Sequence, residues 1–172
     1  MSFKKFLFVP LLIAVMALVL QVIDQQIRGF VEPTGNQGFT WISFQAWAVY
    51  FFAGCTPKGG LKALIGYALG ILLSISIIKC AGLLGALGFW TVPAAIFILV
   101  IPVMCLERVP WLDLIPAIFI GSGAFFAFIT YVPNATLTGA AATEMIYSAI
   151  GLLFGYVSVV LRGKYEKAIL KK

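Results

Sequence analysis

Residues 61–78 read LKALIGYALGILLSISII and carry a single charged side chain, Lys62, near their start. A helix needs about 20 mainly apolar residues to cross the ~30 Å hydrocarbon core of a bilayer. This run is apolar on all sides, whereas the strands of a membrane barrel alternate polar and apolar residues. A helix also satisfies its backbone hydrogen bonds within one segment, as lipid requires. Residues 61–78 therefore predict a transmembrane helix.

Runs of the same kind recur along the whole chain. Of the 172 residues, 62% are hydrophobic and 10% are charged, against about 25% charged in a typical soluble domain. We predict an all-α, polytopic membrane helix bundle with six transmembrane helices, forming one integral membrane domain over residues 1–172. The second span is short, and a re-entrant segment there would reduce the number to five. The expected spans are Phe6–Ile23, Phe39–Thr56, Leu61–Ile78, Gly85–Leu106, Leu114–Thr130 and Thr143–Leu161.

Lysine and arginine are distributed unevenly between the two sides of such a bundle. With six spans and the N-terminus inside, ten of the 12 fall on the cytoplasmic side, as the positive-inside rule requires. The N- and C-termini are therefore both expected in the cytoplasm. The tail Arg162–Lys167 reads as an interface anchor, with attraction of anionic lipid as the alternative. Only Arg28 and Lys79 fall outside.

The two halves of the chain resemble each other. Ala68–Ser74 matches Ala149–Gly155, and Phe44–Phe51 matches Ser122–Ile129. Phe44–Phe51 and Ser122–Ile129 are each followed by a break that contains a proline. A unit of three spans would place the second copy upside down, which is a transporter and channel architecture. We predict a 3+3 inverted repeat with halves of about 1–80 and 81–172, with chance likeness between apolar helices as the alternative.

Small residues recur four positions apart in the matching helices. Such pairs let two helix backbones approach closely, which is how helices adhere in lipid. Faces of this kind in a small protein also favour a homo-oligomer. The expected helix-packing residues are Gly66, Gly70, Ser74, Gly151 and Gly155.

Few polar side chains are expected at membrane depth, and ionisable groups are expected only at span edges. Glu144 is expected to begin the sixth span, where a carboxylate complements the positive helix end; a vestibule site is the alternative. A passive path for a small neutral or weakly charged solute would suit hydroxyl, amide and aromatic linings. The breaks in the two halves point to that path, unless they are simple turns. The pathway-lining candidates are Gln45, Tyr50, Thr56, Ser74, Ser122, Asn134, Thr136, Glu144 and Tyr147.

The chain contains no histidine. This excludes Ser-His hydrolases, Cys-His proteases and histidine-ligated metal sites. No phosphate-binding glycine loop is present, and no basic helix lies outside the membrane to bind nucleic acid. We therefore expect no enzymatic activity, no cofactor, no metal and no nucleic-acid partner. The expected partners are the lipid bilayer, further copies of the chain and a small solute.

The segments Trp41–Phe52 and Phe119–Ala127 resemble the YcdZ-like family of small bacterial inner-membrane proteins of unknown function. The resemblance covers most of the chain and implies a multi-pass protein of the bacterial cytoplasmic (inner) membrane. It implies no substrate and no site residues. The layout is also similar to that of aquaporins, but the paired N-P-A motifs are absent.

Two functions remain open from the sequence. The first is a membrane channel or facilitator for a small solute, indicated by the repeat and the mostly uncharged interior. The second is a non-transporting scaffold or accessory subunit that packs against a partner protein. A channel should contain a polar path through each protomer or along an oligomer axis, whereas a scaffold should be packed shut.

Overall fold

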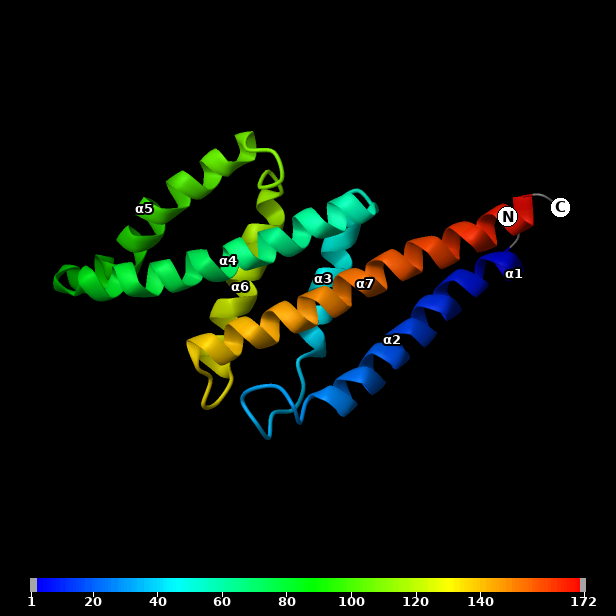
Figure 1. The fold of residues 1–172 in the computed structure, drawn as a ribbon, viewed down its shortest axis with the longest axis horizontal. Helices are drawn as coiled ribbons and strands as arrows, with labels where there is room; N and C mark the ends of the chain where they lie inside the picture. The colour runs from blue at the N-terminus through cyan, green and yellow to red at the C-terminus, as the bar shows by residue number, and fades with distance from the viewer. Residues whose placement is uncertain (1–2, 171–172) are drawn as a thin grey trace.

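The computed structural model describes residues 3–170, and these form helices joined by short connections, without a strand (Figure 1). Each of the six expected spans overlaps a helix, so the all-α prediction is confirmed. The elements are α1 (Phe3–Phe6), α2 (Phe8–Ile27), α3 (Thr40–Phe52), α4 (Pro57–Leu83), the 3₁₀ helix η1 (Gly85–Trp90), α5 (Thr91–Cys105), the 3₁₀ helix η2 (Leu106–Arg108), α6 (Ile115–Tyr131) and α7 (Leu137–Leu170).

Four stretches of the described residues are long and apolar enough to cross a membrane. They are α2, α4, the continuous segment Gly85–Arg108 and α7, and they make this a multi-pass membrane protein. By contrast α3 has 13 residues and α6 has 17. At ~1.5 Å per residue these two are only about 20 and 25 Å long, less than the hydrocarbon thickness.

Capping side chains explain where α4 and α7 begin. Thr56 accepts a hydrogen bond from the amide of Gly59 at 3.0 Å, and Pro57 occupies the first turn, an arrangement typical of helix starts. Thr136 accepts a hydrogen bond from the amide of Gly139 at 3.0 Å. Because of this cap α7 begins at Leu137, six residues before the expected boundary.

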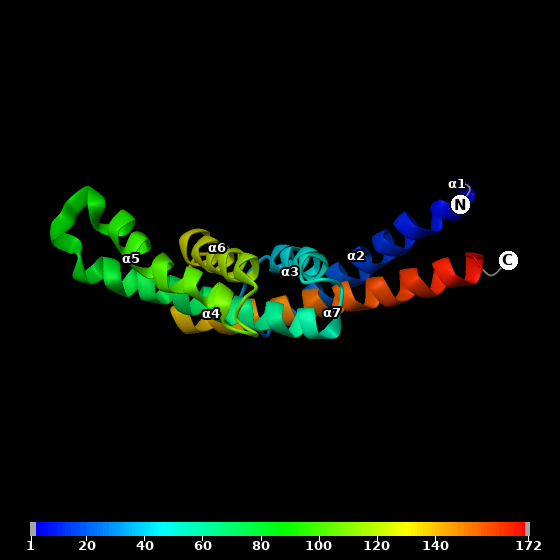
Figure 2. The same cartoon turned by 90° about the horizontal axis from the view of Figure 1, so that it is seen from above.

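The helices form two layers. The long helices α4 and α7 lie side by side and run in opposite directions, while α3 and α6 lie together on one face of them (Figure 2). The most extensive contacts join α3 to α7 and α6 to α4. α3 of the first half thus packs on α7 of the second half, and α6 of the second half packs on α4 of the first. The outer helices are paired across the halves in the same way: α2 lies along α7, and α5 lies along α4 (Figure 1).

Glycine and serine allow the central helices to touch through their backbones. Gly70 on α4 lies against the carbonyl oxygen of Ile118 on α6, and Gly151 on α7 lies against the carbonyl oxygen of Ser43 on α3. A Cβ atom at either glycine would overlap that oxygen. Close backbone contact is the main source of helix association in lipid, where no hydrophobic force draws helices together.

The first and last helices meet at one end of the molecule, where both termini lie (Figure 1). The Tyr165 hydroxyl donates a hydrogen bond to the carbonyl of Lys5 at 2.7 Å. The rings of Phe8 and Tyr165 stack with their centroids 4.1 Å apart. α2 is therefore held to α7 near the start of the chain.

Replacing Gly151 by alanine should destabilise the fold by roughly 1–3 kcal/mol, because the added methyl group meets the backbone of Ser43 and the helices must separate. Gly123→Ala is the matched control, since no atom lies within 4 Å of a Cβ at that exposed helical position. Thermal unfolding in detergent measures the difference. Equal midpoints for the two variants would contradict the proposed role of the close contact.

Candidate functional site around Glu144

Glu144 lies in the protein interior, on the face of α7 that packs against the other central helices. Its side chain is 0% exposed, and neither carboxylate oxygen has a hydrogen-bond partner among the described residues. The same face carries Ala140, Ser148, Gly151 and Gly155, at the three- and four-residue spacing of one helix face. The expectation that this residue caps the helix is wrong, because α7 begins two turns earlier.

Other buried polar groups without a partner lie on α4 and on α7 itself. The hydroxyl of Tyr67 on α4, a helix that packs against α7, is buried and unpaired. The hydroxyl of Ser148, one turn after Glu144 on α7, is also unpaired. Buried polar groups almost always have partners, and an intramembrane ionisable residue is by default a functional-site candidate. We therefore place the candidate site at Glu144, Tyr67 and Ser148.

A second buried carboxylate, Asp24 at the end of α2, is fully paired. Its Oδ1 accepts hydrogen bonds from the hydroxyl of Tyr147 at 2.6 Å and the amide of Phe39 at 2.9 Å. Its Oδ2 accepts one from the side chain of Gln21 at 3.2 Å. Hydrogen bonds to a charged acceptor are the strong ones in proteins. Asp24 therefore ties α2 and the start of α3 to α7.

The connection between α2 and α3 folds over this end of the site. Asn36 donates hydrogen bonds to the carbonyls of Arg28 and Pro33, both at 2.9 Å. The hydroxyl of Thr143 on α7 donates to the carbonyl of Glu32 at 2.9 Å. The connection is thus stabilised by hydrogen bonds within itself, and one further hydrogen bond joins it to the turn of α7 that carries Glu144.

Two hollows lie at opposite ends of the α3–α6 pair. One, of about 370 Å³, is lined by residues 33–39, Trp41 and residues 131–134, at the start of α3 and the end of α6. The other, of about 240 Å³, lies at the end of α3 and the start of α6. It is lined by Phe52, Ala53, Gly54, Gly59, Lys62, Asp113 and Leu114.

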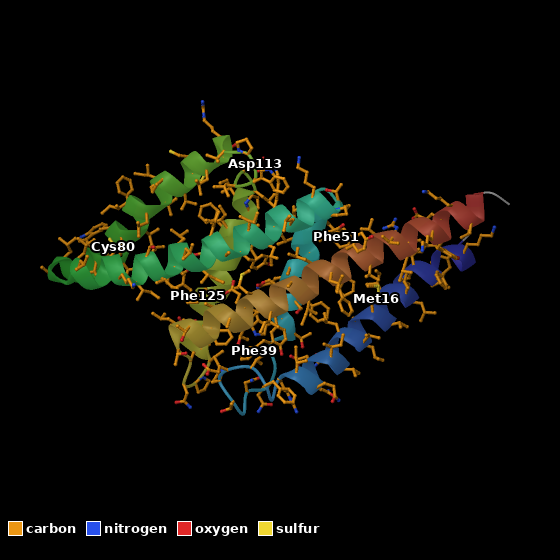
Figure 3. The ribbon with its side chains drawn as sticks, in the orientation of Figure 1. Met16, Phe39, Phe51, Cys80, Asp113 and Phe125 are labelled. Carbon is orange, nitrogen blue, oxygen red and sulfur yellow. The ribbon has the colours of Figure 1, made fainter. Side chains whose placement is uncertain are left out.

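Aromatic rings fill the protein between these hollows. The rings of Phe39 and Phe128 stack with centroids 4.6 Å apart, and Tyr147 meets Phe39 edge to face at 5.7 Å. Phe125 is fully buried in the same layer (Figure 3). These rings therefore form one buried cluster next to the larger hollow, which Phe39 also lines.

An ion pair borders the smaller hollow. Lys62 on α4 donates to both carboxylate oxygens of Asp113, at 2.7 and 2.8 Å, and so joins α4 to the segment that precedes α6. The hydrogen bond from Lys62 holds the pKa of the Asp113 carboxyl below its usual range. The pair is partly exposed, so its contribution to stability is small.

The structure brings only some of the predicted pathway residues together. Tyr50, Glu144 and Tyr147 are buried among the central helices, and Asn134 lines the larger hollow. Gln45 is exposed on the outer side of α3. The remaining four residues make contacts that stabilise the helices. Thr56 and Thr136 cap helix starts. The hydroxyls of Ser74 on α4 and Ser122 on α6 share a hydrogen bond of 2.7 Å.

Sequence reasoning missed Asp24 and Tyr67. A signal for Asp24 was present, because Met16, Leu20 and Asp24 recur every four residues and form the buried face of α2. Tyr67 lies between Gly66 and Gly70, on a helix that is apolar all round, so no pattern marks it. Among residues 3–170, no three cysteine, aspartate or glutamate side chains gather as metal ligands would.

The chain matches the family model described as "Protein of unknown function (DUF1097)" over residues 7–162. The match agrees with the resemblance to an uncharacterised family and does not confirm the likeness to the YcdZ-like group. No curated protein and no solved structure matches the chain. The comparisons therefore assign no residue of the site.

Replacing Asp24 by alanine should lower the free energy of unfolding by roughly 1–3 kcal/mol for each buried donor that it leaves unpaired. Those donors are the Tyr147 hydroxyl and the Phe39 amide. Chemical unfolding measures the loss, and hydrogen exchange at the Phe39 amide should become faster. The exposed Glu107→Ala is the control, and an equal effect of the two variants would contradict the role of Asp24.

The Asp113 carboxyl should titrate below its ordinary value of 3.8, and Lys62→Gln should return it toward that value. Because its pKa in the folded state is lowered, the ion pair stabilises the fold above the unfolded pKa and is lost as the pH falls through the folded pKa. Carboxyl carbon shifts in a pH titration report this directly. A titration that Lys62→Gln leaves unchanged would rule out the pair in solution.

Proposed function

The chain belongs to the DUF1097 family of proteins of unknown function, and from its own residues we propose that it carries a small solute across a membrane at Glu144. The solute is neutral or weakly charged and presents a hydrogen-bond donor or a single positive charge to the carboxylate. The protein acts as a facilitator with a closed resting conformation and without catalytic activity. The unpartnered, fully buried carboxylate of Glu144 is the observation that carries this proposal.

The unpaired polar groups at the Glu144 site destabilise the fold. Burying an ionised carboxylate without a partner is expensive, and even a buried neutral polar group costs about 1–3 kcal/mol when it is unpaired. Tyr67 and Ser148 add two further unpaired hydroxyls beside it. A fold gains nothing from keeping three such groups in its centre. A proton, a cation or the polar groups of a solute would satisfy them.

The proposed architecture is a six-span bundle made of two inverted halves, about 1–80 and 81–172. The exchange of helices supports it, because α3 packs on α7 as α6 packs on α4, and α2 flanks α7 as α5 flanks α4. Gly70 and Gly151 each meet a backbone carbonyl of the partner helix. The short α3 and α6 lie largely within the protein, where a helix need not cross the hydrocarbon by itself.

The site would then lie at the interface of the halves, where transporters of this kind bind their solutes. If Gly70 and Gly151 are equivalent, the position that corresponds to Glu144 in the first half is Ala63, which is also fully buried. The carboxylate is therefore present in one half only. The site would be asymmetric, and a solute would meet its charged group from the side of α7.

The proposed location is the bacterial cytoplasmic membrane, with both termini in the cytoplasm. The termini lie at one end of the molecule (Figure 1), as an even number of crossings requires. Ten of the 12 lysine and arginine residues fall on that side in the six-span arrangement, and cations are retained there. A homo-oligomer is part of the proposal, since α5 buries only Ala95.

A non-transporting scaffold is the second candidate. The aromatic layer of Phe39, Phe125, Phe128 and Tyr147 favours it, because these rings are buried and packed against one another. A scaffold would keep this layer closed at all times. A carrier would have to separate Phe39 from Phe128 during each cycle.

Stopped-flow light scattering on proteoliposomes tests the proposal with a panel of small neutral, cationic and anionic solutes. At least one neutral or cationic solute should cross faster than in empty vesicles. Glu144→Gln should slow that solute by roughly tenfold or more, because a hydrogen bond to a charged group contributes about 1.5–3 kcal/mol. Glu107→Gln, at an exposed position, should leave the rate unchanged.

Two results would reject transport at this site. One is that no solute of the panel crosses faster than in empty vesicles, which would leave the scaffold. The other is an equal effect of the two glutamine variants on the rate. Glu144→Gln should not lower the thermal midpoint of the native protein, because the amide has the shape of the carboxylate and removes only an unpaired charge.

A further inference from the structure

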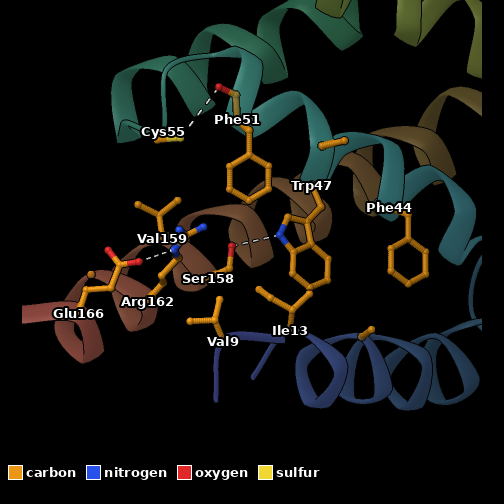
Figure 4. Close-up of a pocket in the computed structure, with 13 residues that line it drawn as sticks. Val9, Ile13, Phe44, Trp47, Phe51, Cys55, Ser158, Val159, Arg162 and Glu166 are labelled. Carbon is orange, nitrogen blue, oxygen red and sulfur yellow. Dashed lines mark hydrogen bonds and ion pairs between the residues drawn. The ribbon is translucent and has the colours of Figure 1, made fainter. Parts of the chain in front are cut away.

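A hollow lies away from Glu144, between α2 and the pair formed by α3 and α7 (Figure 4). It measures about 660 Å³. Val9 and Ile13 of α2 form one wall, and Phe44, Trp47 and Phe51 of α3 form the other. We refer to it as the α2–α3 groove.

Contacts at both ends of α2 hold the groove open. At one end Asp24 is bound by Tyr147. At the other end the Tyr165 hydroxyl binds the carbonyl of Lys5, and Phe8 stacks on Tyr165. Between these ends, Met16 and Leu20 of α2 pack against Trp47. The groove is therefore bordered by a helix that is held in place along its length.

The surface of the groove that a ligand would contact is mainly apolar. Its polar atoms are already paired, since the indole nitrogen of Trp47 donates to the Ser158 hydroxyl at 3.1 Å (Figure 4). The same hydroxyl donates to the carbonyl of Gly155 at 2.8 Å. A hydrocarbon chain can lie on this surface without leaving a polar group unsatisfied.

The end of the groove near the termini is charged. Arg162 lines it and donates through Nε to Glu166 at 2.8 Å. In the described part of the chain, no other hydrogen bond of Arg162 is formed, and its side chain is 57% exposed. A guanidinium has five N–H donors, so its outer edge can bind a phosphate in the bidentate manner that suits arginine. Glu166 also lines this end, but residues 162–167 carry the three cations Arg162, Lys164 and Lys167 against this one carboxylate, so this part of α7 is net positive.

We propose that the α2–α3 groove binds one anionic phospholipid from the membrane leaflet on the side of the termini. Its phosphate lies at Arg162 and an acyl chain follows Val9, Ile13 and Trp47 toward the centre of the membrane. Both the apolar-to-charged gradient and the direction of the groove match a lipid in this orientation. The proposal is independent of transport, because no residue of the Glu144 site lines the groove.

Quenching of Trp47 fluorescence by brominated lipid tests the proposal. The other tryptophans, Trp41, Trp90 and Trp111, are replaced by phenylalanine, and the variant is placed in phosphatidylcholine nanodiscs with a small fraction of brominated lipid. Brominated phosphatidylglycerol should quench Trp47 with about fivefold higher apparent affinity than brominated phosphatidylcholine, the effect of roughly one cation near the surface. Arg162→Gln should abolish this preference. Arg108→Gln, an exposed cation outside the groove, should preserve it.

A groove-filling variant separates the acyl-chain site from the headgroup site. Ala48→Phe places a ring in the groove and should reduce quenching by both lipids. Equal quenching by the two lipids, or a preference that Arg162→Gln leaves intact, would overturn the proposal. Quenching that falls as the protein concentration rises would also overturn it, since a second copy of the chain would then occupy the groove.

If the variant that keeps Trp47 as its single tryptophan does not fold, native mass spectrometry of the otherwise unmodified chain tests the same proposal. The protein released from mixed micelles should retain one phosphatidylglycerol, and Arg162→Gln should lose it while Arg108→Gln retains it. Equal retention by both variants would overturn the proposal.

Discussion

The fold depends on backbone contact between helices at glycine positions. In lipid no hydrophobic force draws apolar helices together, so association rests on how closely their surfaces fit. Gly70 and Gly151 let α4 and α7 touch the backbones of α6 and α3, and these two crossings hold the four central helices in place. The outer helices α2 and α5 are added to this centre. The burial of Glu144 follows from the same contact, because its helix face is the one that approaches α3.

The two buried carboxylates of the protein have opposite surroundings. Asp24 accepts three hydrogen bonds and joins three segments of the chain, so its charge is accounted for by structure alone. Glu144 is equally buried and has none. A structural role explains the first residue and leaves the second unexplained. This contrast within one protein is the reason for assigning solute recognition to Glu144.

Hydropathy alone was sufficient to locate the helices, because a 20-residue apolar run has few other solutions in lipid. α4 begins at Pro57, four residues before the expected span, because the Thr56 hydroxyl caps its first turn. The start of α7 was missed because residues 137–142 are small and only moderately apolar, so hydropathy did not set them apart from a loop. Glu144 was therefore placed at a helix end. Which polar residues meet depends on how distant helices cross, and that is why Gln45 was expected inside and Tyr67 was not.

The exchange of helices between the halves has a consequence for how the protein is made. α3 is short, and the helix on which it packs, α7, is separated from the end of α3 by the 84 residues 53–136. Asp24 likewise gains its hydrogen bond from Tyr147 only after a further 123 residues have been synthesised. Until then an acidic group and a helix of 13 residues must be sheltered by the insertion machinery. Biogenesis would therefore complete in a single late step, and chains that stop before α7 would be substrates for membrane quality control.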